Sequence, residues 1–291
     1  MPTDPDSDAD AGADGEPAES DESWPAPCSD PQTLGDLVAR DRRTSGVALR
    51  APSSGRAYSY RDFVTTSYKS GNVLRYLGVR GGDEVLVVPG TAPEPVLALY
   101  GAAQLGAATR FADTVRGDPP RTVLAPVARE REFALPPGHN LAVHGGPPDD
   151  PKTTHWEAEV WSENPAVHPA DVAPDDPLLL AEDRTYTHAA MLSAAVTVVD
   201  SAGLSPGDTV VIDEPIREPG VVAAGLVAPI LAGATTVLPD GDERPAAAAD
   251  GSLTDDPGRT VVIARGGPNA DQSVVDAGQY VDPDTVEFDG H

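Results

Sequence analysis

Two stretches of the chain repeat one order of apolar and polar segments, and this order predicts the fold. In the first stretch, Ser59 and Asp62 form a helix-start signal, and apolar residues from Phe63 to Leu77 recur on one helical face. A glycine-rich turn leads into EVLVV, residues 84–88, whose continuous apolar run indicates a buried strand. The prolines of PGTAPEP suit the first turn of a second helix, which we expect to end near Gly106, before the short strand AATRF.

The same order returns after residue 183, in RTYTHAAMLSAAVTVVDSAGLSPGDTVVIDEPIREPGVVAAGLVAPILAGATTVL. The turn residues of the two copies correspond in pairs: Gly78 with Gly203, Gly82 with Gly207, Asp83 with Asp208, and Gly106 with Gly233. Two strands joined through a helix usually lie parallel with a right-handed crossover. The sequence therefore predicts an α/β protein made of two pseudo-repeated, helix-flanked and mainly parallel sheets.

The segments around the two copies set the expected domain boundaries. Residues 1–30 contain almost no large apolar side chain and are expected to form a disordered acidic tail. Residues 31–170 form the first predicted α/β subdomain, in which RTVLAPV and NLAVHGG extend the first sheet. Residues 171–291 form the second, in which PLLLAE supplies the first strand and RTVVIA a later one.

One apolar stretch raises the question of a membrane. Residues 220–238, GVVAAGLVAPILAGATTVL, carry no charge and nearly reach spanning length. The stretch is rich in alanine and glycine, is interrupted by Pro229 and Gly233, and ends in the β-favouring run ATTVL. We therefore expect a buried helix followed by a buried strand, and no membrane insertion.

The charge of the chain limits its partners and its setting. The sequence holds 47 Asp and Glu against 20 Lys and Arg, a net charge of -27, and Lys69 and Lys152 are its only lysines. A surface so rich in carboxylates suits concentrated salt, where repulsion between them is screened, so we expect a halophilic host. Nucleic-acid binding and attachment to anionic membranes are excluded, because both need clustered basic residues.

The single cysteine and the N-terminus indicate a cytoplasmic protein. Cys28 lies in the polar tail and has no second cysteine to pair with, which fits a reducing compartment and a free surface thiol. The N-terminus carries acids where a signal peptide carries a basic segment and an apolar run. We expect no secretion by that route.

The residues of the two copies resemble a known family. YSYRDFVTTSYKSGNVLRYLGVRGGDEVLVVPGTAPEPVLALYGAAQLGAAT is similar to the opening of the AMP-dependent acyl-CoA synthetases and other adenylate-forming ligases. DDPLLL, TYTHAAML, LSPGDTVVI and APILAGATTVL resemble the second subdomain of that family, so the resemblance covers residues 34–264. It implies activation of a carboxylate with ATP to an acyl-adenylate, followed by transfer to coenzyme A.

The sequence departs from that family where the chemistry takes place. In the family, the DDP strand precedes a Ser/Thr/Gly-rich loop ending in Pro-Lys-Gly that holds the nucleotide phosphates. Here AEDRTYTH follows Leu180, and Glu182 and Asp183 bring carboxylates to that place. The family's aromatic-His segment is replaced by PIREPG, and no position matches its Tyr-Gly-x-Thr-Glu motif, its ribose-binding Asp or its catalytic Lys.

For three other motifs, a purely structural role explains the sequence better than a binding or catalytic role. GVRGGDE follows a helix and precedes a strand, so it is expected to be a turn and not an anion-binding loop. Arg265, Gly266 and Gly267 follow the strand RTVVIA and are the candidate cofactor-binding residues, although a plain loop is favoured there. The histidines match no metal-ligand spacing and are interpreted as solvated loop residues: His139, His144, His155 and His168. We assign no catalytic residue and no metal ligand.

The sequence therefore predicts an acyl-CoA synthetase-like protein without catalytic activity, acting as a binding or regulatory subunit. One alternative is a ligase component that is active only with a second polypeptide, and another is a protein that binds an acyl group or CoA without chemistry. No cofactor is expected, and ATP, AMP or CoA would bind only if the family activity survives. The expected partners are a second copy of the chain or another protein, because apolar surface covered by further subdomains in the family needs a cover here.

Overall fold

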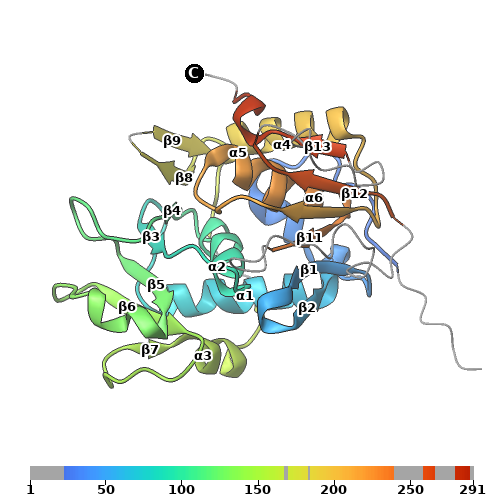
Figure 1. Cartoon of the computed structure of the whole chain (residues 1–291). Helices are drawn as coiled ribbons and strands as arrows, with labels where there is room; N and C mark the ends of the chain where they lie inside the picture. The colour runs from blue at the N-terminus through green and yellow to red at the C-terminus, as the bar shows by residue number, and fades with distance from the viewer. Residues whose placement is uncertain (1–22, 167–169, 183, 239–257, 266–278, 289–291) are drawn as a thin grey trace, which may run out of the picture.

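The computed structural model describes residues 23–166, 170–182, 184–238, 258–265 and 279–288. They form two β-sheets with helices packed against them, which confirms the predicted α/β class (Figure 1). A single large cluster of buried apolar residues runs through both halves, from Leu34 near the N-terminal end to Ile263 in a late strand.

The first sheet has seven strands in the order β7-β6-β5-β3-β4-β8-β9. Its strands are β3 (Glu84–Val87), β4 (Ala108–Phe111), β5 (Thr122–Pro126), β6 (Asn140–His144), β7 (Thr154–His155), β8 (Pro177–Ala181) and β9 (Arg184–Thr187). Neighbouring strands pair in parallel, except for β8 and β9, which form an antiparallel hairpin. RTVLAPV and NLAVHGG contain β5 and β6, so their predicted place in this sheet is confirmed.

The second sheet has six strands in the order β13-β12-β10-β11-β1-β2. Its strands are β1 (Val47–Ala51), β2 (Arg56–Ser59), β10 (Thr209–Ile212), β11 (Thr235–Val237), β12 (Thr260–Ile263) and β13 (Gln279–Val281). Here too a parallel sheet ends in one antiparallel hairpin, formed by β1 and β2.

The α-helices are α1 (Tyr60–Tyr76), α2 (Glu94–Ala103), α3 (Trp156–Ser162), α4 (His188–Ala202), α5 (Pro219–Val221) and α6 (Ala228–Ala232). Helices α1, α2 and α4 and the helical run of α5 to α6 lie in the intervals that the pattern predicted, whereas α3 and the 3-10 helices were not predicted. A π-helical stretch, η5 (Val222–Val227), joins α5 to α6. Short 3-10 helices are η1 (Leu34–Val38), η2 (Arg40–Arg42), η3 (Pro52–Ser54), η4 (Val127–Glu132) and η6 (Pro283–Thr285).

The helix-start signal at Ser59 works as predicted. The Ser59 hydroxyl accepts a hydrogen bond from the backbone N–H of Asp62 at 3.1 Å and so caps α1. In the second copy, the Thr187 hydroxyl accepts the N–H of Ala190 at 3.2 Å and caps α4. The two corresponding helices therefore begin with the same local chemistry.

The internal repeat extends to the hydrogen bonds of the turns. Gly82 donates its N–H to the carbonyl of Gly106 at 2.8 Å, and Gly207 donates to Gly233 at 3.2 Å. All four residues have a positive φ, between 68° and 84°, a conformation that favours glycine. The predicted correspondence of these glycines is confirmed, because each pair closes the same turn in its own half.

The hairpin that starts each copy belongs to the sheet of the other copy. β1 pairs in parallel with β11, whereas β8 pairs in parallel with β4 (Figure 1). PLLLAE was expected to be the first strand of the second sheet, and this is wrong: its strand β8 joins the first sheet. The exchange of hairpins ties the two halves together through backbone hydrogen bonds, which a sequence repeat does not reveal.

The apolar stretch 220–238 forms a buried helix followed by the buried strand β11, as predicted. Side chains of the first half bind its backbone. The Tyr100 hydroxyl donates to the carbonyl of Leu226 at 2.8 Å, the Tyr60 hydroxyl to that of Ala234 at 2.7 Å, and Arg42 Nη2 to that of Ile230 at 2.6 Å. Buried donors thus bind backbone carbonyls across the seam between the halves.

The packed part of the chain begins closer to the N-terminus than the sequence predicted. Residues 1–22 of the expected tail lie outside the described residues, but the tail prediction is wrong for residues 23–30. The N–H of Cys28 donates to the carbonyl of Leu231 at 2.9 Å, and Trp24 lies against Gly46 and Gly207. The Cys28 side chain is half-buried, and this burial raises the pKa of its thiol.

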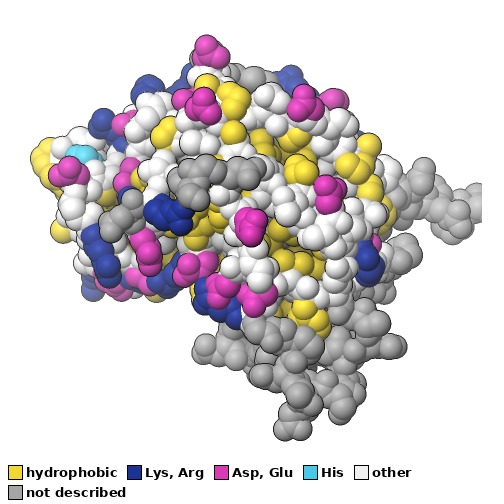
Figure 2. Space-filling view, turned by 90° about the horizontal axis from the view of Figure 1, so that it is seen from above, with side chains coloured by type: hydrophobic (Ala, Val, Ile, Leu, Met, Phe, Trp, Pro, Cys, Tyr) yellow, Lys and Arg dark blue, Asp and Glu magenta, His cyan; other side chains and the backbone are white. Residues whose placement is uncertain are grey.

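Charges of both signs are interspersed on the surface. On the face drawn in Figure 2, basic side chains lie beside acidic ones, and apolar side chains show between them. Among the described residues, no helix combines the length and apolar character needed to cross a bilayer.

Candidate functional site

The turn between β8 and β9 lies where the sequence comparison expected a phosphate-binding loop. Ala181 pairs with Arg184, so only Glu182 and Asp183 connect the two strands. Glu182 has a φ of 50°, and its carbonyl accepts a hydrogen bond from Arg110 Nη1 at 3.3 Å. A phosphate cradle needs several successive backbone N–H groups around the anion. A two-residue turn cannot supply them.

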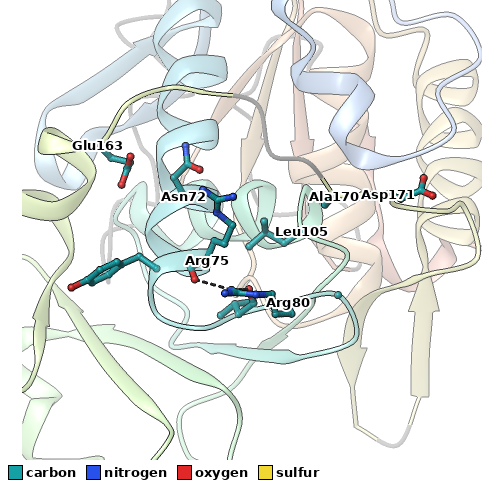
Figure 3. Close-up of a pocket in the computed structure, with 10 residues that line it drawn as sticks. Asn72, Arg75, Arg80, Leu105, Glu163, Ala170 and Asp171 are labelled. Atoms are coloured by element: carbon teal, nitrogen blue, oxygen red, sulfur yellow. Dashed lines mark hydrogen bonds between the residues drawn. The ribbon is translucent and has the colours of Figure 1, made fainter.

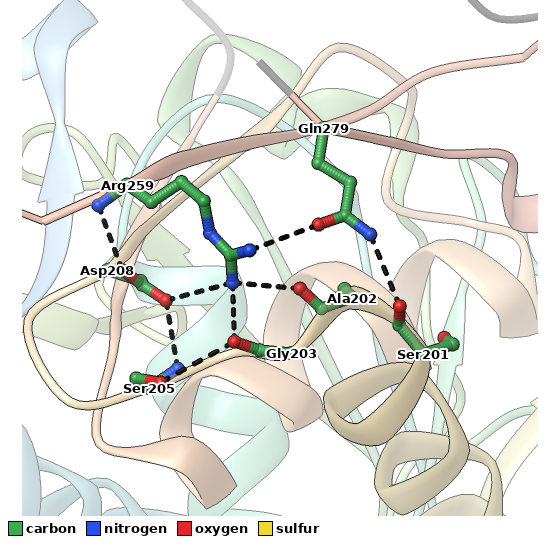
Figure 4. Close-up of polar contacts among 7 residues, drawn as sticks. All are labelled: Ser201, Ala202, Gly203, Ser205, Asp208, Arg259 and Gln279. Carbon is green, nitrogen blue, oxygen red and sulfur yellow. Dashed lines mark hydrogen bonds and ion pairs between the residues drawn. The ribbon is translucent and has the colours of Figure 1, made fainter. Parts of the chain in front are cut away.

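The two Gly-Asp turns are structural, as expected for GVRGGDE. The Asp83 carboxylate accepts the N–H of Arg80 at 2.8 Å, and Asp208 accepts that of Ser205 at 2.9 Å. In the second copy, Arg259 completes the turn through its own N–H to Asp208 at 2.8 Å and through guanidinium contacts to Asp208, Ala202 and Gly203 (Figure 4). These carboxylates and amides hold the turn itself and offer no cradle for a ligand.

Arg265, the candidate cofactor-binding residue, is surrounded by carboxylates. Its Nε lies 3.1 Å from Asp284, its Nη1 lies 3.7 Å from Glu214, and its Nη2 lies 3.9 Å from Glu218. The hydrogen bond that Arg265 donates to Asp284 is the largest cause that raises the pKa of Arg265. Gly266 and Gly267 lie outside the described residues. An anion at this guanidinium would have to compete with the carboxylates that already surround it.

A second ion-pair cluster joins the carboxyl edges of the two sheets. Asp113, after β4, lies 2.9 Å from Arg129 Nη1 and 2.5 Å from Nη1 of Arg217, which follows β10. Burial alone would raise the pKa of Asp113, but hydrogen bonds from Arg217 and Arg129 outweigh it and lower that pKa. Ligands of open α/β sheets usually bind at this edge. Here the chain's own charges pair with one another across it.

A buried polar cluster lies near the carboxyl end of β6. Glu94 begins α2 and is 3% exposed, and it bonds to Arg56 from the exchanged hairpin. Nδ1 of His144 lies 3.8 Å from the same carboxylate, while Arg56 also bonds to the Tyr58 hydroxyl. Burial raises the pKa of Tyr58 to about 12 and lowers that of His144, for which Glu94 compensates only in part. The cluster is closed to solvent except through Arg56 and fastens the β1–β2 hairpin to the first sheet.

The histidines differ from the sequence interpretation at two positions, because His144 is buried and the partly exposed His155 belongs to strand β7 and not to a loop. His144 is 4% exposed, so its interpretation as a solvated loop residue is wrong. His139 Nδ1 lies 2.8 Å from the carbonyl of Pro120, and His155 Nε2 lies 3.5 Å from Glu157. His168 lies outside the described residues. Within the described part of the chain, no group of three or more His, Cys, Asp or Glu residues could hold a metal ion.

A cavity lies at the opposite edge of the first sheet. It has a volume of about 750 Å³ and lies beside the end of α1 and the amino ends of β3 and β4 (Figure 3). Arg75, Arg80 and Tyr76 line it together with buried apolar residues. The sequence analysis did not find this pocket, because its walls come from segments that are far apart in the chain.

Comparison with known proteins links the fold to one group of enzymes. No protein-family model and no curated protein matches the sequence. Solved structures match. MatB from Rhodopseudomonas palustris matches with a TM-score of 0.66 at 16% identity over 80% of this chain and 49% of that chain. The anthranilate CoA ligase AuaEII in complex with anthranoyl-AMP also matches with a TM-score of 0.66. Its identity is 20%, and the match covers 80% of this chain and 49% of that chain.

An acyl-CoA synthetase from Brucella canis has a TM-score of 0.65 at 18% identity over 79% of this chain and 47% of that chain. The chain thus spans about half the length of the structures it matches. At these identities the comparison establishes a shared fold.

Proposed function

We propose that this chain, which shares the fold of the adenylate-forming ligases, is a catalytically inactive relative that acts as a binding or regulatory subunit. The observation that carries the proposal is the two-residue turn between β8 and β9. The resemblance places a nucleotide-phosphate loop at this turn, and Glu182 brings a negative charge to it. Repulsion from a carboxylate would oppose the phosphates of ATP.

The electrostatics of the neighbouring loops support the same conclusion. Arg265 and Arg217, which follow strands at the carboxyl edge of the second sheet, are both paired with carboxylates. A nucleotide bound there would take these arginines away from carboxylates that they already pair with, and carboxylates near a ligand phosphate are unfavourable. Neither arginine is therefore available to stabilise a developing phosphate charge.

The test is ATP–pyrophosphate exchange with purified full-length protein, a panel of carboxylates and about 2 M KCl. We expect no exchange above background and no rise in melting temperature with ATP or AMP, because a ligand that binds the native state would raise it. The control variant is Arg265→Gln. Exchange that depends on the protein and disappears in this variant would show that the chain contains a working nucleotide site.

The proposed partner is a second copy of the chain or another protein, and the proposed setting is the cytoplasm of a halophilic host. Tyr76 and Trp161 support an interaction surface, since their side chains are 79% and 86% exposed. Light scattering coupled to gel filtration in about 2 M KCl should show a particle of twice 30.1 kDa if the partner is a second copy. If the partner is another protein, affinity capture from host lysate at the same salt should recover it. A clean monomer without a recovered partner would contradict the subunit role.

A ligase component completed by a second polypeptide is the competing candidate, favoured by the match to only about half of each enzyme. Adding the recovered partner to the ATP–pyrophosphate exchange assay distinguishes an inactive subunit from a ligase component. Exchange by the mixture would favour the competing candidate, whereas continued inactivity would support the inactive subunit.

A further inference from the structure

The pocket beside the end of α1 is distinct from the region that the family resemblance points to. Gly81 and Leu105, which line it, precede β3 and β4, so the pocket lies at the amino edge of the first sheet. The β8–β9 turn follows β8, which runs parallel to β4, and therefore lies at the opposite edge. A ligand in this pocket is independent of any nucleotide chemistry.

The floor of the pocket is apolar and held in place. Val79 is 0% exposed and Leu105 is 5% exposed. Beside them, the Asn72 carboxamide donates to the carbonyls of Asn164 and Ala166 at 2.8 and 3.2 Å. These bonds fasten the segment around Asn164 to α1, so that wall is formed before a ligand arrives.

Two guanidinium groups lie at the rim. Arg80 Nη1 donates to the carbonyls of Arg75 and Val79 at 2.8 and 2.7 Å, which fixes its position at the end of α1 (Figure 3). In the described part of the chain, no carboxylate forms an ion pair with the guanidinium of Arg75 or Arg80. Other arginines of this acidic chain do pair with carboxylates: Arg56, Arg110, Arg129, Arg259 and Arg265.

The acidic residues of the rim limit the charge of a ligand. Glu163 and Asp171 also line the pocket, and in the view of Figure 3 they lie on opposite sides with Arg75 and Arg80 between them. The Glu163 carboxylate accepts the N–H of Asn164 at 2.9 Å. A ligand with several negative charges would meet repulsion from both sides, so a single oxyanion near the arginines fits best.

An aromatic side chain extends the apolar floor to the surface. Tyr76 lines the pocket, although its side chain is 79% exposed. An aromatic ring in contact with solvent gains free energy when an apolar group covers it. The pocket therefore combines a place for one negative charge with one exposed aromatic ring.

We propose that this pocket binds a monocarboxylate with an apolar chain or ring. The carboxylate lies between Arg75 and Arg80, which suit it because a guanidinium can bind both of its oxygens. The apolar part lies against the exposed ring of Tyr76, and the buried Val79 and Leu105 lie behind it. This proposal does not depend on the chain being an inactive ligase.

The test is isothermal titration calorimetry with octanoate, acetate and octan-1-ol on the full chain in about 2 M KCl. Octanoate should bind. Acetate lacks the apolar part and octan-1-ol lacks the charge, so each should bind at least about tenfold more weakly. Arg75→Gln should weaken octanoate binding by about tenfold or more, because it removes a charge-assisted hydrogen bond.

Two further variants keep the test decisive. Arg61→Gln removes an exposed arginine from the other end of α1 and should leave octanoate binding unchanged. Ala170→Trp places a large side chain at an exposed position of the rim and should block the pocket without disturbing the core. The proposal is overturned if octanoate binds no better than acetate or octan-1-ol. Equal binding by the Arg75→Gln, Ala170→Trp and Arg61→Gln variants would overturn it as well.

Discussion

His188 should make the stability of the protein depend on pH. The side chain is 0% exposed at the start of α4, and its Nδ1 accepts the backbone N–H of Leu34 at 3.0 Å. Its Nε2 has no hydrogen-bond partner among the described residues. Burial lowers the pKa of His188 to about 4, and the nearby Asp176 and Asp36 oppose this shift only in part.

The sign and size of the effect follow from the two protonation equilibria. Above its ordinary pKa of 6.5, His188 is neutral in the folded and the unfolded chain, so its contribution to stability is fully present. As the pH falls from there toward about 4, the unfolded chain takes up a proton and the folded chain does not. Between about pH 7.5 and about pH 5, this difference lowers the free energy of unfolding by about 2 kcal/mol.

The assay compares the wild type with His188→Asn by urea unfolding at these two pH values in about 2 M KCl. Asparagine offers an oxygen to the N–H of Leu34 but has no group that titrates in this range. Tryptophan fluorescence reports unfolding, because Trp156 is 1% exposed in the folded state. His139→Asn, at a partly exposed histidine, is the matched control and should behave like the wild type.

The wild type should lose about 2 kcal/mol more than His188→Asn on going to the lower pH. Burial also lowers the pKa of His144, but that residue is present in both proteins, so its effect cancels in the comparison. An equal loss in the two proteins would refute the reasoning, since it would mean that His188 takes up its proton in the folded state.

Three other perturbations test the packing and the charge. Tyr100→Phe should lower the free energy of unfolding by about 1–3 kcal/mol, because the carbonyl of Leu226 loses a buried donor, whereas Tyr76→Phe at the surface should change it little. Gly101→Ala should cost about 1–3 kcal/mol, because a Cβ there would lie 2.7 Å from the backbone N of Gly71, and urea unfolding measures both effects. Circular dichroism should show a lower melting temperature in dilute buffer than in about 2 M KCl, because dilute buffer leaves the charge of -27 unscreened. Equal melting temperatures in the two buffers would contradict the halophile argument.

Much of the local structure could be predicted from the sequence. The start of α1 at Ser59, the turn at Gly82 and Asp83, and the helix-to-strand character of residues 220–238 all depend on neighbours in the chain. Caps, positive-φ glycines and apolar periodicity act over a few residues, so their effect is visible in a short window. The repeat was visible for the same reason, since each copy carries its own local signals.

The candidate site was less predictable, because side chains from distant segments decide it. Arg265 follows a strand, as an anion-binding residue could, but Glu214 and Asp284 neutralise it from positions far away in the chain. His144 lies near the end of the predicted strand NLAVHGG, and only the fold shows that it is buried beside Glu94. Neither pairing has a period or a spacing that a sequence pattern could show.

The sequence by itself determined the α/β class, the order of most elements, the acidic surface and the short connection after β8. Only the tertiary structure decided that β1 and β2 join the second sheet while β8 and β9 join the first. The physical reason is that a strand's own residues specify its extended shape and apolar face, whereas its backbone hydrogen bonds go to whichever sheet edge lies beside it in the folded chain. Which edge that is depends on how both halves pack around their common core.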